Sequence, residues 1–296
     1  MIDFKLKRGM NFDHQVSTPG KGLAQEKYIK LIKDNGFDHI RLPFWFEDCN
    51  PSEDYLNRIA ESAKMVTDQG LYAFVDVHPL VGMNKDPQNM KHDLYKLWES
   101  LSTHLKDADE KVIFEIFNEP NGAFDAELLN EVQNECIRII RKTNPTRLIA
   151  AACAEFNTVE HVHHLQLPED DENIFVTLHC YAPMEFSHQA APWYKVCKWP
   201  KGATWGTEED YKAMEHRVKL MADWGKANNR HIHLGEFGII ALVPDDQRAE
   251  WTGNIIRLCE ENGIAWCYWD FVKSFAVYDE EKDEWNKTLL DVMIRP

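Results

Sequence analysis

The sequence has no long hydrophobic run. None of its 296 residues falls in a window of about 18 consecutive apolar residues, so no transmembrane helix is predicted and no membrane partner is expected. The first residues, MIDFKLKRGMNF, also lack the apolar stretch that follows the basic residues of a secretory signal peptide. These two absences predict a cytoplasmic protein. The alternative is a secreted protein whose leader is missing from this chain.

Paired cysteine motifs are absent as well. The seven cysteines are an odd number, and no two of them form a C-x-x-C pair. Several lie inside apolar runs such as AACAEF and AWCYWDF. Buried cysteines of this kind behave as small hydrophobic residues, so free thiols in a reducing compartment are predicted in place of a disulfide framework.

Positive charge is scarce. The chain carries 33 Lys and Arg against 49 Asp and Glu, which gives a net charge of −16. An acidic surface repels phosphate backbones, so nucleic acid is not an expected partner, whereas a neutral ligand is unaffected. No linker, low-complexity tract or short repeat interrupts the chain, and residues 1–296 are therefore predicted to form a single domain that acts as a monomer.

What the sequence does contain is a series of short apolar runs rich in β-branched and aromatic residues, which predict strands. The predicted strands are RGMNF (8–12), HIRLPF (39–44), YAFVDVH (72–78), VIFEIFN (112–118), LIAAACA (148–154), IFVTLHCY (174–181), HIHLGEF (231–237) and AWCYWDF (265–271). Segments with helical apolar spacing lie between them. Three of these segments are YLNRIAESAKMVTDQG, AELLNEVQNECIRIIRK and YKAMEHRVKLMADWGKANN. The first is predicted to end at Gly70, and the third at Gly225 or Asn228.

Alternating strands and helices predict a parallel sheet. Eight such units in this length favour an α/β fold of the closed (β/α)8 TIM-barrel type. An open doubly wound sheet would need a phosphate-binding G-x-G-x-x-G after its first strand, and that fingerprint is absent. The longest irregular segment, roughly 182–206, follows the sixth strand on the face where barrels build active sites.

Polar, titratable and aromatic side chains stand at the carboxyl ends of the predicted strands. They are Asn11, Arg41, His78, Asn118, Glu119, His179, Tyr181, Glu236 and Trp269. Because functional residues of barrels gather at these strand ends, the set predicts one substrate-binding and catalytic site. The alternative is that each residue is a loop or structural hydrogen-bonding group that happens to stand there.

Glu119 and Glu236 lie at the ends of strands 4 and 7, which lie across the barrel mouth from each other. A pair of carboxyl groups suits glycoside cleavage, in which one protonates the leaving oxygen and the other attacks or activates water. The acid needs a raised pKa and the nucleophile a depressed one. We expect Arg41 to keep Glu236 ionised and Tyr181 to orient it. Two further roles are hypotheses, a contact from Asn118 to the sugar 2-OH and an apolar floor formed by Trp269.

Four segments at the strand ends carry a family resemblance: FNEPNG, HCYAPMEFSHQ, LGEFG and YWDF. They resemble the strand 4, 6, 7 and 8 motifs of glycoside hydrolase family 5, and most closely those of bacterial endo-β-1,4-glucanases that also cleave mannan. The likeness runs from RGMNF to VYDEEKDEWNKTLL. It implies a retaining endo-acting enzyme on a polysaccharide or oligosaccharide, without a metal or other cofactor, with Glu119 as acid/base and Glu236 as nucleophile.

The resemblance also places other residues. Arg41, His78, Asn118, His179, Tyr181 and Trp269 fall on the family's active-site positions, and Trp193 matches an aromatic that lines the substrate cleft. Two segments depart from close relatives. Pro79 stands where many carry a second histidine after strand 3, and strand 1 ends in NFDHQ instead of an Asn-rich, Gly-containing segment. Both sites line the non-reducing side of the cleft in the family, so a changed preference between glucan and mannan is expected.

Three other interpretations were open at this point. The chain could be a barrel that binds sugar without cutting it, a metal-dependent lyase or a phosphate-handling isomerase, although LGEFGII and YWDFVKSF favour neither of the last two. His161 and His164 in EHVHHL are spaced as a metal pair, but no third ligand is evident and a solvated helix after the fifth strand is the favoured interpretation. The histidines of HIH (231–233) are predicted to face away from Glu236 under ideal strand alternation and to serve packing or polar structure.

Overall fold

Eight parallel strands close into a barrel in which each strand pairs with the next and β8 pairs with β1. The structure is a computed structural model that describes residues 4–12, 25–193 and 198–294. The strands are β1 (Arg8–Asn11), β2 (His39–Phe46), β3 (Tyr72–Leu80), β4 (Val112–Glu115), β5 (Ile149–Ala151), β6 (Ile174–His179), β7 (Ile232–Glu236) and β8 (Ala265–Tyr268). The predicted (β/α)8 barrel and all eight of its strands are therefore confirmed.

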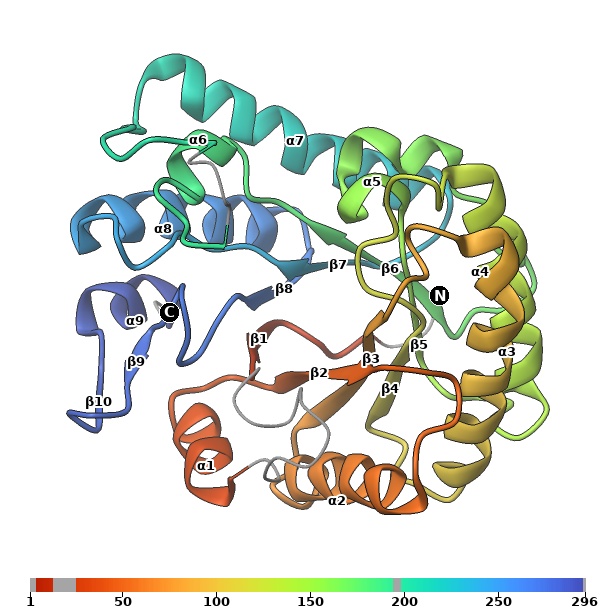
Figure 1. The fold of residues 1–296 in the computed structure, drawn as a ribbon. Coiled ribbons are helices and arrows are strands. Elements are labelled where there is room, and N and C mark those ends of the chain that lie inside the picture. Colours follow the sequence, from red (N-terminus) through yellow and green to blue (C-terminus); the bar gives the residue numbers. More distant parts are fainter. Residues whose placement is uncertain (1–3, 13–24, 194–197, 295–296) are drawn as a thin grey trace.

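Helices surround the strands (Figure 1). They are α1 (Glu26–Asp34), α2 (Glu53–Asp68), α3 (Pro87–His104), α4 (Ala126–Arg141), α7 (Glu208–Ala227), α8 (Asp245–Glu261) and α9 (Lys287–Met293). Short polar residues begin several of them. The Ser52 side chain accepts from the Tyr55 amide at the start of α2, and Thr207 and Asp210 form a capping box on α7. Asn228 caps the end of α7, as one of the two predicted stops.

The connection after β5 departs from the regular pattern. A full helix was expected there, but the chain forms only a four-residue turn, α5 (Ala154–Asn157), and a 3-10 helix, η1 (Val159–His164). Three successive residues, Glu155, Phe156 and Asn157, have positive φ values of 52°, 62° and 58°. This left-handed backbone is costly for non-glycine residues and cannot continue into an α-helix.

The remaining elements lie outside the barrel wall. They are α6 (Met184–Ser187), in the segment between β6 and α7, and the two-stranded pair of β9 (Tyr278–Asp279) and β10 (Glu284–Trp285). Among the described residues, no helix is both long enough and apolar enough to cross a membrane. Six cysteines are free and buried, as predicted, and Cys197 lies outside the described residues.

Two bulges in the barrel wall decide which side chains face inward. Phe44 pairs with Val77 and Phe46 with Leu80, so two residues of β3 lie opposite a single residue of β2. On β7, Leu234 pairs with Leu178 and Glu236 with His179, which makes Gly235 the extra residue. A bulge turns the residues beyond it to the other face of the sheet.

The bulge at Gly235 corrects the prediction for HIH. His233 lies inside the barrel, with its ring 4.8 Å from Phe74 and its Nε2 atom 3.0 Å from His39 Nε2. Glu236 also faces the interior, three residues later, because Gly235 breaks the alternation. The position requires glycine, since an added Cβ would lie 2.2 Å from Thr177 Oγ1.

The barrel interior changes from apolar to charged along its axis. Leu6, Phe74, Ile113, Ala150, Phe175 and Ala265 form an apolar cluster that is separate from the larger core between strands and helices. Along β3, Asp76 and His78 follow Phe74 on the same face, and along β4, Glu115 follows Ile113. The polar end of the interior is therefore the carboxyl end of the strands.

Candidate active site

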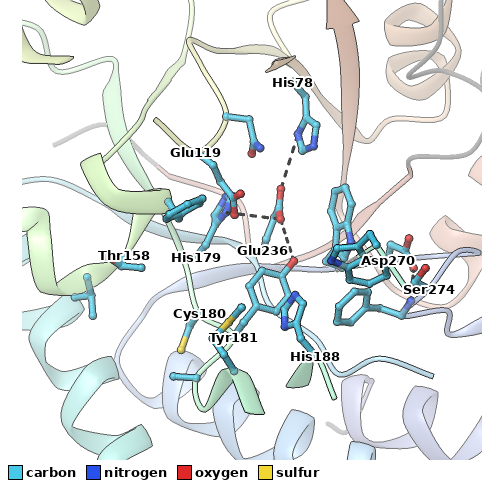
Figure 2. Close-up of a pocket in the computed structure, with 18 of the residues that line it drawn as sticks. His78, Glu119, Thr158, His179, Cys180, Tyr181, His188, Glu236, Asp270 and Ser274 are labelled. Atoms are coloured by element: carbon cyan, nitrogen blue, oxygen red, sulfur yellow. Dashed lines mark hydrogen bonds and ion pairs between the residues drawn. The ribbon is translucent and has the colours of Figure 1, made fainter. Parts of the chain in front are cut away.

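A cleft of about 930 Å³ opens at the carboxyl ends of the strands. It is lined by side chains from β2, β3, the connection after β4, η1, β6, β7 and the segment after β8. Glu119 and Glu236 both line it. Figure 2 shows Glu236 in the middle of the pocket, with Thr158 on one side and Asp270 and Ser274 on the other. The residues predicted from the strand ends thus meet around one cavity.

The two carboxyl groups face each other. His179 Nδ1 lies 2.9 Å from Glu119 Oε1 and 3.6 Å from Glu236 Oε2. One oxygen of each carboxyl group and one nitrogen of His179 all lie within 4.8 Å of one another. Two groups at this spacing can act on opposite sides of a single bond.

Arg41 is the fully buried centre of a charged network beneath the cleft. Its guanidinium donates to Glu236 Oε1 at 2.7 Å and to both oxygens of Glu115, through Nε at 2.7 Å and Nη2 at 2.8 Å. Nη2 also lies 2.9 Å from Asp76 Oδ2. These carboxylates hold the pKa of Arg41 well above its usual value, against the opposing effect of burial. A permanent positive charge therefore lies against Glu236.

Tyr181 also orients Glu236, and His78 lies near it. The Tyr181 hydroxyl donates to Oε2 at 2.9 Å, and His78 Nδ1 lies 3.9 Å from Oε1 (Figure 2). The His78 ring is stacked on Trp269, with ring centroids 5.5 Å apart and planes 7° from parallel. Since Arg41 and Tyr181 satisfy one oxygen each, the carboxylate is held in a single orientation at the cleft floor.

Glu119 has a different environment. It follows the end of β4 with a positive φ of 49°, and its side chain is 28% exposed. Burial raises the pKa of Glu119 to about 7, although His78 and Arg41 oppose the shift. A carboxyl group with this pKa holds a proton near neutral pH and can give it up to a leaving group.

The tautomer of His179 follows from Asn157. Burial lowers the pKa of His179 to about 4, so the ring is neutral. The Asn157 Oδ1 atom accepts from the Cys153 amide at 3.0 Å, which directs its Nδ2 group to His179 Nε2 at 3.3 Å. Nε2 is then the acceptor and Nδ1 carries the hydrogen. His179 therefore donates to Glu119 Oε1 and leaves the acid proton on the other oxygen.

The other predicted residues take supporting positions. Asn118 accepts from Arg41 Nη2 at 2.7 Å and lines the cleft. Asn11 is fully buried, accepts from Arg41 Nη1 at 2.9 Å and donates to the Gly235 carbonyl at 2.9 Å, so it supports Arg41 beneath the cleft. Trp193 lines the cleft and is 46% exposed. Of the NFDHQ segment, residues 13–15 lie outside the described residues.

Three residues of the site were missed by the sequence analysis. They are Asp76, Glu115 and Asn157. The signal for the first two was present, because each places a carboxylate in the middle of a run of buried apolar residues, YAFVDVH and VIFEIFN. Buried carboxylates need a partner, which Arg41 supplies. Nothing in the sequence indicated the left-handed turn that positions Asn157.

Two groups of described residues have the proximity of metal ligands. One consists of Glu119, His179 and Glu236. The other consists of His39, His233 and Cys267 in the barrel interior, where the two imidazoles are hydrogen-bonded directly to each other. The histidines of EHVHHL lie on η1, and His163 and His164 are exposed.

A closed parallel barrel with two carboxyl groups facing each other at the carboxyl ends of β4 and β7 is the arrangement of a glycoside hydrolase. Comparison with known families makes this specific. The model of the cellulase family, glycosyl hydrolase family 5, matches residues 7–274, and the chain belongs to this family.

Comparisons with individual proteins agree with this family assignment. The chain is 25% identical to Endoglucanase H of Acetivibrio thermocellus over 99% of its own length but spans only 33% of that protein. It resembles the structure of cellulose synthase subunit Z of Clostridioides difficile, with a TM-score of 0.93, 30% identity, and coverage of 98% of this chain and 100% of the other. Thermotoga maritima Cel5A, solved with cellobiose, has a TM-score of 0.91 at 30% identity, with 97% of each chain covered. Cel5A has also been solved with mannotriose.

Proposed function

We propose that this protein is a retaining endo-β-1,4-glycanase that hydrolyses β-1,4-glucan by double displacement. The observation that carries the proposal is the spacing of Glu119 and Glu236, which have carboxyl oxygens within 4.8 Å of each other. Retaining enzymes hold their two carboxyl groups about 5–5.5 Å apart, whereas inverting enzymes need roughly 6.5–9.5 Å to admit a water between carboxylate and sugar.

In the first step, Glu236 attacks the anomeric carbon of the sugar above it. Glu119 transfers its proton to the glycosidic oxygen as the bond from that oxygen to the anomeric carbon breaks. The products are an ester between the sugar and Glu236, and a free leaving sugar. Arg41 and Tyr181 fix the attacking carboxylate, and Trp269 lies beside it as an apolar floor for the ring.

In the second step, Glu119 is an anion and acts as a base. It takes a proton from a water molecule that attacks the anomeric carbon of the ester, which releases the Glu236 carboxylate and restores the Glu119 acid. His179 donates to Glu119 throughout, because its Nε2 atom is occupied by Asn157. All these groups come from one chain and no cofactor enters either step, so a monomer suffices.

Glucan is proposed as the substrate because the relatives named above include an endoglucanase, and Cel5A was solved with cellobiose. Mannan is a second candidate, since Cel5A was also solved with mannotriose. The net charge of −16 is compatible with both, because both polymers are neutral.

The test is an assay of reducing ends released from carboxymethyl cellulose. We expect the wild-type protein to be active, and Glu236→Gln and Glu119→Gln to lose on the order of 10²–10⁴-fold or more in rate. Glu99→Gln is the matched control, because Glu99 is exposed on α3 away from the cleft. Near-wild-type hydrolysis by Glu236→Gln would show that the nucleophile is wrongly assigned.

The roles of the two glutamates are separated with an aryl β-cellobioside. If its phenol is strongly acidic, the phenolate leaves without protonation, so the first step of Glu119→Gln should stay fast and appear as a burst of phenol, while Glu236→Gln should give none. NMR detection of the first-formed product should show the β-anomer, the same configuration as the substrate. An α-anomer would indicate inversion and would contradict the double displacement.

A further inference from the structure

Trp45 is an exposed aromatic in an otherwise buried strand. The other residues of β2 are buried, yet the Trp45 side chain is 43% exposed and lines the cleft. A large apolar face turned toward solvent has no structural advantage, and in a cleft it is typical of a binding surface. None of the catalytic steps above uses this residue.

Trp45 lies opposite the bulge between β2 and β3. Trp45 is the single residue of β2 that lies opposite the two bulged residues of β3, His78 and Pro79. Bulges near active sites redirect side chains, and Pro79 has no amide hydrogen for a regular ladder. Trp45 lies on the same strand face as Arg41, and His78 lies on the same face as Asp76, so both reach the cleft, and their ring centroids are 6.0 Å apart.

The backbone of Trp45 is held in place. Its carbonyl accepts from the Tyr55 hydroxyl at 2.9 Å, and the Tyr55 ring packs on both neighbours of Trp45, at 6.4 Å from Phe44 and 5.6 Å from Phe46. A platform that is rigid before the ligand arrives loses little entropy on binding. The site is therefore prepared for a flat apolar ligand surface.

Three neighbouring rings line the cleft, and we call them the aromatic row: Trp269 stacks on His78, and Trp45 lies on His78 in turn. The sugar attacked by Glu236 occupies the space beside Trp269 and His78. The leaving sugar must lie past Glu119, which protonates its oxygen. In Figure 2, Thr158 and His78 lie on opposite sides of Glu119. Trp45, one ring beyond His78, thus belongs to the non-reducing side of the scissile bond.

We propose that Trp45 stacks on the second sugar on the non-reducing side and makes this contact a determinant of where the chain is cut. The inference rests on the proposed function. A β-1,4-linked glucose unit has equatorial hydroxyl groups, so both faces of its ring present C–H groups to an aromatic surface. Recognition at this position therefore acts through the ring face instead of through a histidine side chain at position 79.

The test uses two products from one substrate. An aryl β-cellobioside releases the phenol when both sugars lie on the non-reducing side, and releases the aryl glucoside when only one does. We expect Trp45→Ala to lower the ratio of phenol to aryl glucoside about tenfold, the size of a lost aromatic contact. Trp45→Phe should restore most of the ratio. Since it compares two products of one enzyme, the ratio does not depend on how much protein is folded.

The control is Trp224→Ala, which removes a partly exposed tryptophan on α7 outside the cleft and should leave the ratio unchanged. An unchanged ratio in Trp45→Ala would overturn the inference, and a raised ratio would place Trp45 on the reducing side. A wild-type protein that cleaves carboxymethyl cellulose but not the aryl cellobioside would also contradict the inference, because two sugars bound on the non-reducing side should be enough for cleavage. If the wild-type protein cleaves no β-glucan at all, the proposed function itself is wrong, and this outcome differs from a failure of the inference about Trp45.

Discussion

Single residues decide how the two glutamates differ. Glu236 lies against the charge of Arg41 and accepts from Tyr181, whereas Glu119 has the neutral ring of His179 as its closest partner. The same side-chain chemistry therefore supplies a bound carboxylate at one position and a carboxylic acid at the other. In the proposed mechanism, the separation of roles comes from what surrounds each group.

The raised pKa of Glu119 predicts the alkaline side of the pH profile. The acid must be protonated in the free enzyme, so kcat/KM on a neutral glucan should fall as the pH rises above about 7. The measurement is kcat/KM against pH. In Glu119→Gln, burst rates with the aryl cellobioside should show no such decline. A wild-type rate that persists unchanged to pH 9 would contradict the assignment of Glu119 as the acid.

At the scale of elements, bulges contribute as much as regular strands to the placement of the site residues. Both interrupt parallel ladders near the mouth of the barrel, one at His78 and Pro79 and one at Gly235. His78 follows Asp76 on the inward face of β3 by regular alternation, whereas the bulge at Gly235 turns Glu236 inward after His233. The turn after β5 acts similarly, because its left-handed residues position Asn157 against His179. Irregular backbone thus places the groups that regular strands would misdirect.

The bulge at Pro79 leads to a prediction about specificity. Pro79→His adds the imidazole that many relatives carry, and we expect it to change the ratio of activity on glucan to activity on mannan. The reason is that a hydrogen-bonding ring distinguishes the orientation of sugar hydroxyls, which a stacked face does less well. The measurement is kcat/KM on cello- and manno-oligosaccharides of equal length.

Pro79→Ala is the control for that experiment. It also restores an amide hydrogen at position 79 but adds no polar group, so it reports the effect of the bulge alone. If Pro79→His and Pro79→Ala leave the same ratio as the wild-type protein, position 79 has no part in the choice between the two polymers.

The whole molecule carries a net charge of −16, which affects its encounter with charged polymers. Carboxymethyl cellulose is an anion and should be repelled at low ionic strength, whereas hydroxyethyl cellulose is neutral. Added salt screens such repulsion over about 10 Å at 0.1 M. We therefore expect kcat/KM on the anionic polymer to rise several-fold between about 10 and 200 mM salt.

Hydroxyethyl cellulose is the control for this prediction, and its kcat/KM should not change over the same salt range. Equal salt responses for the two polymers would mean that the surface charge has no influence on binding. The comparison uses the same enzyme and the same assay of reducing ends, so differences in stability do not enter.

The sequence by itself determined the eight strands, the barrel, and the positions of Glu119 and Glu236, because apolar periodicity and strand ends are local features of the chain. Only the tertiary structure decided which groups surround the residues at each strand end. It placed His233 inside the barrel, it joined Asp76 and Glu115 to Arg41, and it brought Asn157 to His179. These contacts join residues far apart in the chain, and bulges and left-handed turns set their directions. Strand alternation alone cannot predict such directions, since one extra residue reverses them.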